Sequence, residues 1–298
     1  MSESFEIIEE SFRRILRPGS ELGLLAEGFQ FTEGPTWWPA MGCLIFSDIP
    51  GDTIYRWSEG EGLGVFRRPS RRANGNTADR HGNLITCEHG SRAVTRTSPD
   101  GEVATLADRY GGKRLNSPND VAVKSDGTIW FTDPPYGVKP ENCEQPANYV
   151  FRLDPGAAEP VIVAEGLSRP NGLCFSPDER LLYIADSDKD IHHIRRFEVE
   201  GGNMLGGGEV FATITPGLPD GMRVDAEGRL YSTAADGVQV LSPDGELLGK
   251  IHTPQTAANC AFGGADGRTL FITATSSLWC VQLAVAAATP IDGMIAGS

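Results

Sequence analysis

A tight turn that recurs six times along the 298-residue chain limits the folds open to it more than any other feature. The six turns span residues 39–42, 80–83, 125–127, 177–180, 225–228 and 265–268. An apolar run follows each of them, at residues 44–46, 84–86, 129–131, 182–184, 230–232 and 270–272. A second strand-like run then follows, most clearly at 54–57, 149–153 and 238–241. Units of about 40–50 residues with this internal pattern are typical of four-stranded propeller blades.

The repeat therefore predicts an all-β chain folded as a six-bladed β-propeller with four-stranded antiparallel blades. The apolar runs do not alternate strictly, which suits strands covered on both faces by neighbouring blades. A β-sandwich is the alternative, because its strands also come with frequent turns, but six units in one register weigh against it. We expect one domain over residues 1–298, with an N-terminal extension at 1–20 and a strand within 21–30 that closes the last blade. Helix is expected only near residues 7–16, and residues 284–298 carry no clear signal.

Charge and composition narrow the range of partners. The formal net charge is −14, and the basic pairs at 67–68 and 71–72 are short, so neither nucleic acid nor an anionic membrane is an expected partner. No basic segment followed by an apolar stretch opens the chain, which predicts a cytoplasmic protein. We expect its partner to be a small molecule and the protein to be a monomer or dimer. The six cysteines form no CxxC pair, and we expect them to be reduced and buried.

One position in the repeat always carries a side chain with an oxygen donor. Six residues before the start of each turn, or five in the fifth unit, the chain has Glu33, Asn74, Asn119, Asn171, Asp220 and Asn259. The first strand of each propeller blade lines the central channel, so these positions should converge at one rim of the axis. A hard cation such as Ca²⁺ takes about six to eight oxygen ligands, and two carboxylates would balance its charge. The alternative is that Asn and Asp simply start strands after turns, as they often do. In four of the six units, a glycine directly follows the ring residue.

A second set of acidic residues is expected at the same rim. The second strand of each blade runs antiparallel to the first, so its far end returns there. Those ends are Asp48, Glu88, Asp133, Asp186, Ala234 and Ala274. The four acids could orient ligands or relay protons, although a solvated acidic rim is the alternative, above all for Asp48 and Glu88. His89 follows Glu88 at this rim, where it could act in catalysis or simply pack.

Several motifs of the chain resemble those of a known protein family. The motifs are Phe31-Thr32-Glu33-Gly34-Pro35, Ile85-Thr86-Cys87-Glu88-His89-Gly90, Arg114-Leu115-Asn116-Ser117-Pro118-Asn119-Asp120, Trp130-Phe131-Thr132-Asp133-Pro134-Pro135-Tyr136-Gly137, Arg169-Pro170-Asn171-Gly172-Leu173 and Pro219-Asp220-Gly221-Met222. Over residues from about 27 to 280, the chain resembles bacterial gluconolactonases of the regucalcin and gluconolactonase superfamily. Paraoxonase and diisopropyl-fluorophosphatase are more distant members of that group.

The resemblance implies a six-bladed propeller with a catalytic calcium on its axis. Its metal ligands would be the matches to Glu33, Asn119, Asn171 and Asp220, a subset of the ring obtained by counting. In regucalcin-like members an Arg and an Asn before the third ligand strand contact the sugar, which implies Arg114 and Asn116 here. Of the paraoxonase histidine pair near the metal, the chain keeps His89 and has Asn74 at the other place.

We therefore predict metal-dependent hydrolysis of a sugar lactone such as glucono-1,5-lactone. One divalent cation, Ca²⁺ before Mg²⁺ or Zn²⁺, would bind the carbonyl oxygen and stabilise the oxyanion. Asp220 would activate the water, with His89 as the alternative base. The substrate contacts would be Arg114, Asn116, Tyr136, Asn74 and Asp133. Phosphotriester or fluorophosphate hydrolysis on the same metal, and a calcium-binding propeller without catalysis, are the competing functions.

Overall fold

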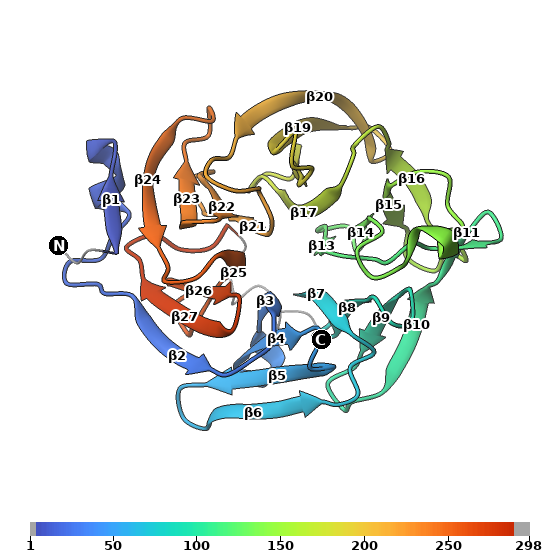
Figure 1. Cartoon of the computed structure of the whole chain (residues 1–298), viewed down its shortest axis with the longest axis horizontal. Coiled ribbons are helices and arrows are strands. Elements are labelled where there is room, and N and C mark those ends of the chain that lie inside the picture. The colour runs from blue at the N-terminus through green and yellow to red at the C-terminus, as the bar shows by residue number, and fades with distance from the viewer. Residues whose placement is uncertain (1–3, 289–298) are drawn as a thin grey trace.

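The computed structural model describes residues 4–288 and arranges them as six antiparallel sheets around one axis (Figure 1). This confirms the predicted six-bladed β-propeller, and each of the six apolar runs lies in the second strand of its blade. Residues 1–3 and 289–298, which the sequence assigned to the N-terminal extension and to the segment without clear signal, lie outside the described residues. No helix within residues 4–288 is long and apolar enough to cross a membrane.

The blades follow one another along the chain, each with its first strand at the axis. Blade 1 consists of β3 (Thr32–Trp38), β4 (Cys43–Asp48), β5 (Thr53–Ser58) and β6 (Gly62–Arg67), and blade 2 of β7 (Ala73–Ala78), β8 (Leu84–Glu88), β9 (Ala93–Thr97) and β10 (Val103–Ala107). The hairpin of β11 (Arg109–Tyr110) and β12 (Lys113–Arg114) precedes blade 3, which consists of β13 (Val121–Val123), β14 (Ile129–Asp133), β15 (Tyr149–Leu153) and β16 (Val161–Ala164).

The second half of the ring repeats this plan. Blade 4 consists of β17 (Pro170–Phe175), β18 (Leu181–Asp186), β19 (His193–Glu200) and β20 (Met204–Thr213), and blade 5 of β21 (Met222–Val224), β22 (Leu230–Ala234), β23 (Gly237–Leu241) and β24 (Leu247–His252). Blade 6 consists of β25 (Ala257–Gly263), β26 (Thr269–Ala274), β27 (Ser277–Gln282) and β2 (Gly23–Glu27). Three short 3₁₀ helices also occur: η1 (Glu10–Arg14), η2 (Pro39–Met41) and η3 (Pro140–Asn142).

The last blade takes its outer strand from the start of the chain. β2 pairs antiparallel with β27, with Leu24 opposite Trp279 (Figure 1). A sheet edge exposes unpaired N–H and C=O groups, so this pairing both covers the edge of β27 and joins the two ends of the ring.

The segment before β2 differs from the sequence-based expectation of a helix near residues 7–16. β1 (Phe5–Ile7) adds a fifth strand to blade 5 by pairing with β24, and only the one-turn η1 follows it. A short isolated helix is only marginally stable in water. The conformation of this segment is instead set by packing, because Phe12 and Ile15 are fully buried against blades 5 and 6. Their spacing of three residues suits a 3₁₀ turn.

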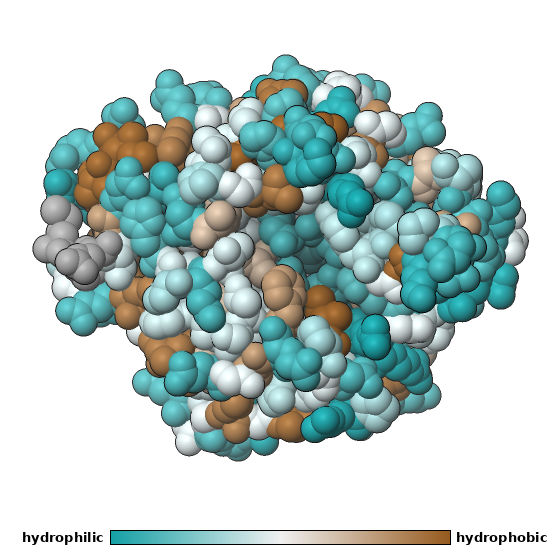
Figure 2. Space-filling view, in the orientation of Figure 1, coloured by the Kyte–Doolittle hydropathy of each residue, from teal (hydrophilic) through white to brown (hydrophobic). Residues whose placement is uncertain are grey.

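Apolar side chains fill the wedges between neighbouring blades. Between blades 2 and 3, for example, Ile85 and Val94 pack with Phe131 and Phe151. The expectation that all cysteines are buried is wrong for Cys143, which follows η3 in a surface loop, and for Cys280 in β27; both are partly exposed, and all six are free thiols. At the axis the packing stops, and Figure 2 shows a hydrophilic depression at the centre of the visible face.

Candidate active site

The axial ring of oxygen donors opens into one cavity. Glu33, Asn74, Asn119, Asn171 and Asp220 line a space of about 620 Å³. Each comes from the start of a different inner strand or from the loop just before it. The sixth member of the ring, Asn259, is buried and does not line the cavity.

Hydrogen bonds between blades connect the members of the ring. Asn74 Nδ2 donates to Asn119 Oδ1 at 2.6 Å, and Asn119 Nδ2 donates to Asn171 Oδ1 at 2.5 Å. On the other side, Asn259 Nδ2 donates to Glu33 Oε2 at 3.1 Å. The ring positions found by counting therefore bring side chains of neighbouring blades into direct contact around the axis.

The glycines after four ring residues serve close packing. A Cβ on Gly75 would lie 2.6 Å from the carbonyl oxygen of Asn119, and one on Gly221 would overlap the Asn259 amide. Only Gly34 of the four has a positive φ, of 51°. Turn preference alone thus does not explain the Asn-Gly and Asp-Gly pairs; glycine lets the neighbouring blade's ring residue approach the axis.

Two carboxylates of the ring lie in this cavity, whose wall also includes Arg169, Asp188 and Lys189. Among residues 4–288, neither Glu33 nor Asp220 forms an ion pair with Lys, Arg or His within 4.0 Å. Burial raises the pKa of Glu33 to about 7, with the Asp120 carboxylate adding to the shift. Burial and the charges of Glu33 and Asp120 hold the pKa of Asp220 well above its usual range.

These residues fit a hard cation better than a soft one. No group of three or more His, Cys, Asp or Glu suited to a metal occurs within the described part of the chain, so a zinc-type cluster is absent there. Two mutually repelling carboxylates, of which Glu33 is buried and Asp220 partly exposed, lie beside two amide oxygens and provide the oxygen set that Ca²⁺ accepts. A divalent cation would remove the repulsion that raises both pKa values.

Three of the four rim acids hold the loops that lead to ring residues. Asp48 accepts backbone N–H bonds from Gln30 and Phe31, both at 3.1 Å. Asp186 accepts them from Ser168 at 2.9 Å and Arg169 at 2.8 Å, and Asp133 from Asn116 at 2.7 Å. The fourth, Glu88, pairs with Arg67 at 2.7 Å. All four are buried, so the alternative of a solvated acidic rim is wrong.

His89 and Tyr136 both line the cavity. His89 Nε2 lies 3.2 Å from Asn74 Nδ2, and burial lowers its pKa to about 4, so the imidazole is neutral at pH 7. Burial raises the pKa of Tyr136 to about 12, which keeps its hydroxyl protonated. The Arg169 guanidinium stacks over the Tyr136 ring at 5.6 Å from its centroid.

The structure does not bring Arg114, Asn116 or Asp133 to this cavity. Arg114 donates to the Ser91 carbonyl at 2.6 Å and lines a separate surface pocket. Asn116 is 1% exposed, with its amide bonded to the Asp133 and Ala147 carbonyls, and Asp133 is fully buried. Their assignment as substrate contacts does not agree with this geometry; Asn116 and Asp133 fix the loop before Asn119.

Sequence reasoning missed most of the cavity wall. Arg169 lines the cavity, and its position two residues before Asn171 is the sequence signal that places it at the same rim. An apolar group also lines the cavity, formed by Phe31, Ile49, Pro50, Leu218 and Pro219. These residues come from loops between blade strands. Loop residues have no fixed spacing from the repeated turns, so counting along the repeat does not predict them.

Comparison with known proteins identifies one family. The model of the SMP-30/Gluconolactonase/LRE-like region matches residues 31–276. The gluconolactonase of Zymomonas mobilis is 35% identical over 89% of this chain and 82% of its own length.

Solved structures agree with this match. A gluconolactonase from Xanthomonas campestris has a TM-score of 0.89 at 40% identity, covering 94% of this chain and 95% of its own. A calcium-binding regucalcin from Agrobacterium tumefaciens has a TM-score of 0.75 at 20% identity, covering 90% and 95%, a likeness that concerns the fold alone.

Proposed function

Because the chain belongs to the SMP-30/gluconolactonase/LRE-like family, we propose that it opens sugar lactones such as glucono-1,5-lactone with the help of one divalent cation. The family and the gluconolactonase relatives identify it as a lactone-hydrolysing enzyme. The observation that carries the metal proposal is the pair of carboxylates, Glu33 and Asp220, which lie in one cavity and form no ion pair within 4.0 Å in the described chain.

Glu33, Asn119, Asn171 and Asp220 would hold the cation, with Ca²⁺ preferred to Mg²⁺ or Zn²⁺ for this all-oxygen set. When bound, the cation polarises the lactone carbonyl and stabilises the negative charge that develops on its oxygen. Asn259 keeps the Glu33 carboxylate in place, because its amide donates to Oε2. The amide chain from Asn74 to Asn171 fixes the two ligand amides in the same way.

Asp220 is the proposed base that takes a proton from the attacking water, since it lines the cavity as a carboxylate. His89 is the second candidate: it is neutral, and its ring reaches the same cavity beside Asn74. His89→Gln tests the second candidate by itself, because it leaves all four proposed cation ligands in place, whereas Asp220→Asn would also remove one of the two charges of the cation site.

Arg169 and Tyr136 are the proposed contacts for substrate hydroxyls in place of Arg114 and Asn116. Asp186 holds the Arg169 backbone, so this guanidinium stands on a fixed loop two residues from a proposed cation ligand. The apolar group of Phe31, Ile49, Pro50, Leu218 and Pro219 offers a surface for the C–H face of a sugar ring. A cytoplasmic location and a monomeric or dimeric state stay predictions.

The test is a pH-stat assay of the purified protein on glucono-1,5-lactone, an unsubstituted δ-lactone and a phosphotriester. We expect turnover of the sugar lactone that is lost on exhaustive chelation and returns with Ca²⁺. Turnover that survives chelation would contradict the metal proposal, and hydrolysis of the phosphotriester alone would favour the competing function. Cation binding without turnover of any substrate would leave only the non-catalytic alternative.

A further inference from the structure

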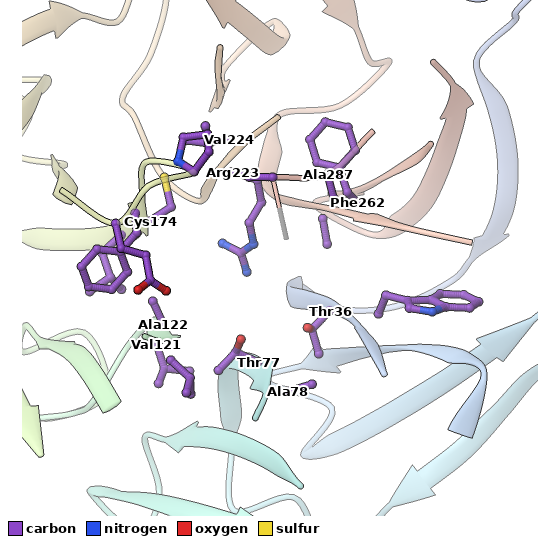
Figure 3. Close-up of a pocket in the computed structure, with 18 of the residues that line it drawn as sticks. Thr36, Thr77, Ala78, Val121, Ala122, Cys174, Arg223, Val224, Phe262 and Ala287 are labelled. Carbon is purple, nitrogen blue, oxygen red and sulfur yellow. The ribbon is translucent and has the colours of Figure 1, made fainter. Parts of the chain in front are cut away.

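Below the ring of oxygen donors, the channel has a second layer of side chains. Three residues after each ring position the chain has Thr36, Thr77, Ala122, Cys174, Arg223 and Phe262, which all line a separate cavity of about 230 Å³. Figure 3 shows the Arg223 guanidinium extending toward the middle of this cavity. In this layer of six, Arg223 is the one charged residue.

Asp120 connects this layer to the ring above. It follows Asn119 directly, and its Oδ1 accepts the Val121 N–H at 2.9 Å. Its Oδ2 is buried without a hydrogen-bond partner and lies 3.8 Å from Arg223 Nη1. Arg223 Nη1 itself donates to the Met222 carbonyl at 2.7 Å, which holds the side chain in the channel.

The balance of charges around the ring suggests a role for Arg223 and Asp120. When ionised, Glu33, Asp220 and Asp120 carry three negative charges in one buried region, and Arg223 supplies one positive charge. The remainder of two negative charges equals the charge of one divalent cation. The charges of Asp120 and Arg223 are close enough to act on Glu33: the Asp120 carboxylate raises the pKa of Glu33, and the Arg223 guanidinium lowers it.

We propose that Arg223 is a built-in counter-ion that neutralises Asp120 from the second layer of side chains and thereby limits how tightly the ring binds its cation. This inference rests on the proposed cation site. Arg223 touches neither the cavity above nor any ring residue by hydrogen bond or ion pair among those described, so it is a positioning residue rather than a catalytic one.

The proposal predicts opposite effects on two measurements. Without Arg223, Asp120 is a buried carboxylate with no countercharge, so the cation-free protein loses stability. The added cation then becomes the only remaining countercharge, and its affinity rises. A merely structural role for Arg223 predicts the reverse for affinity, because a loosened ring would bind the cation more weakly.

The experiment compares Arg223→Met with the charge-conserving Arg223→Lys, using calorimetric titration with Ca²⁺ and thermal unfolding in chelator. We expect Arg223→Met to bind Ca²⁺ on the order of tenfold more tightly than the unmodified protein, with a lower Tm in chelator. Arg223→Lys should stay close to the unmodified protein in both. Adding Asp120→Asn to Arg223→Met should return the affinity and raise the Tm, because the unpaired charge is then gone.

Unchanged or weaker Ca²⁺ binding by Arg223→Met would overturn the counter-ion role. If the unmodified protein bound no Ca²⁺, Mg²⁺ or Zn²⁺, the proposed cation site would fail instead, and the pairing would still be tested by the Tm values in chelator. In that case a Tm of Arg223→Met that Asp120→Asn does not raise would overturn the pairing as well.

Discussion

At the scale of single residues, the site depends on where each carboxylate finds its partner. Glu33 receives one amide N–H from Asn259 and the N–H of Gly34 at 2.8 Å, and it forms no ion pair within 4.0 Å among residues 4–288. Asp133 receives the Asn116 N–H, whereas its Oδ1 is buried without a hydrogen bond. Both carboxylates are therefore only partly compensated in the described structure, and their substitution should have measurable, different consequences.

Glu33→Gln removes one of the two formal charges that would balance the cation while keeping the shape of the side chain. We expect Ca²⁺ affinity to fall on the order of tenfold or more, and turnover at limiting Ca²⁺ to fall with it. Excess Ca²⁺ should restore part of the activity. Titration calorimetry and pH-stat rates measure both, with Glu61→Gln on the surface as the matched control. Full turnover by Glu33→Gln in chelator would disprove the role.

Asp133→Asn should change how stability depends on pH. Burial raises the pKa of Asp133 from 3.8 to about 7, so the folded protein retains a proton that the unfolded chain releases near pH 4. The contribution to stability is thus complete below pH 4 and is lost as the pH rises through 7. In chelator, the unfolding free energy of the unmodified protein should fall by up to a few kcal/mol more over this range than that of Asp133→Asn.

Urea denaturation between pH 4 and 8 provides the comparison, and Asp266→Asn in an exposed turn serves as control. Parallel curves for Asp133→Asn and the unmodified protein would show that Asp133 does not titrate in this range.

The sequence predicted ring positions well because the repeat supplies a register, and it failed where the chain leaves that register. Glu33, Asn119 and Asn171 follow from counting back from turns. Arg114 and Asn116 were placed by motif alone, and the loop after β12 directs the Asn116 amide toward the buried Asp133 carbonyl instead of the cavity. Position along a loop does not determine which side of the backbone a side chain occupies.

At the scale of elements, the acidic ends of three second strands support the loops that precede inner strands. The carboxylate at the end of β18 holds the Ser168 and Arg169 N–H groups before β17, and the one at the end of β4 does the same before β3. The sequence showed these acids and their shared position. The sequence could not show that backbone N–H groups, rather than water, donate hydrogen bonds to these carboxylates, because the donors depend on how the loops fold back onto the strand ends.

Asp186→Ala tests this support. It leaves two N–H groups without acceptors in a partly buried loop, at a cost of about 1–3 kcal/mol in unfolding free energy. Because the loop leads to Asn171 and carries Arg169, Ca²⁺ affinity should fall and the KM for a polyhydroxylated lactone should rise. Asp186→Asn, which keeps an oxygen acceptor, should lie between Asp186→Ala and the unmodified protein. Equal affinity and KM in all three proteins would mean that the carboxylate supports stability alone.

At the scale of the whole molecule, both ends of the described chain contribute to closing the ring. β2 completes blade 6, and the residues before it cross from blade 5, where β1 pairs with β24. The repeat in the sequence predicted the ring and the closing strand but not the added strand of blade 5. That strand is only three residues long, which is too short to show a periodic pattern in the sequence. Its position depends on the burial of Phe12 and Ile15 in the segment that follows it.

Phe12→Ala tests whether this N-terminal segment stabilises the whole propeller. The Phe12 ring is fully buried among side chains of blades 5 and 6, and it lies so close to Gly249 that a Cβ there would overlap it. Truncating a buried Phe costs about 3–5 kcal/mol, whereas Ile8→Ala, at a side chain that is 43% exposed, should cost less than about 1 kcal/mol. Urea denaturation followed by tryptophan fluorescence measures both, and we expect one cooperative transition with a lower midpoint for Phe12→Ala. Equal midpoints for the two variants would mean that blades 5 and 6 are held together without the segment before β2.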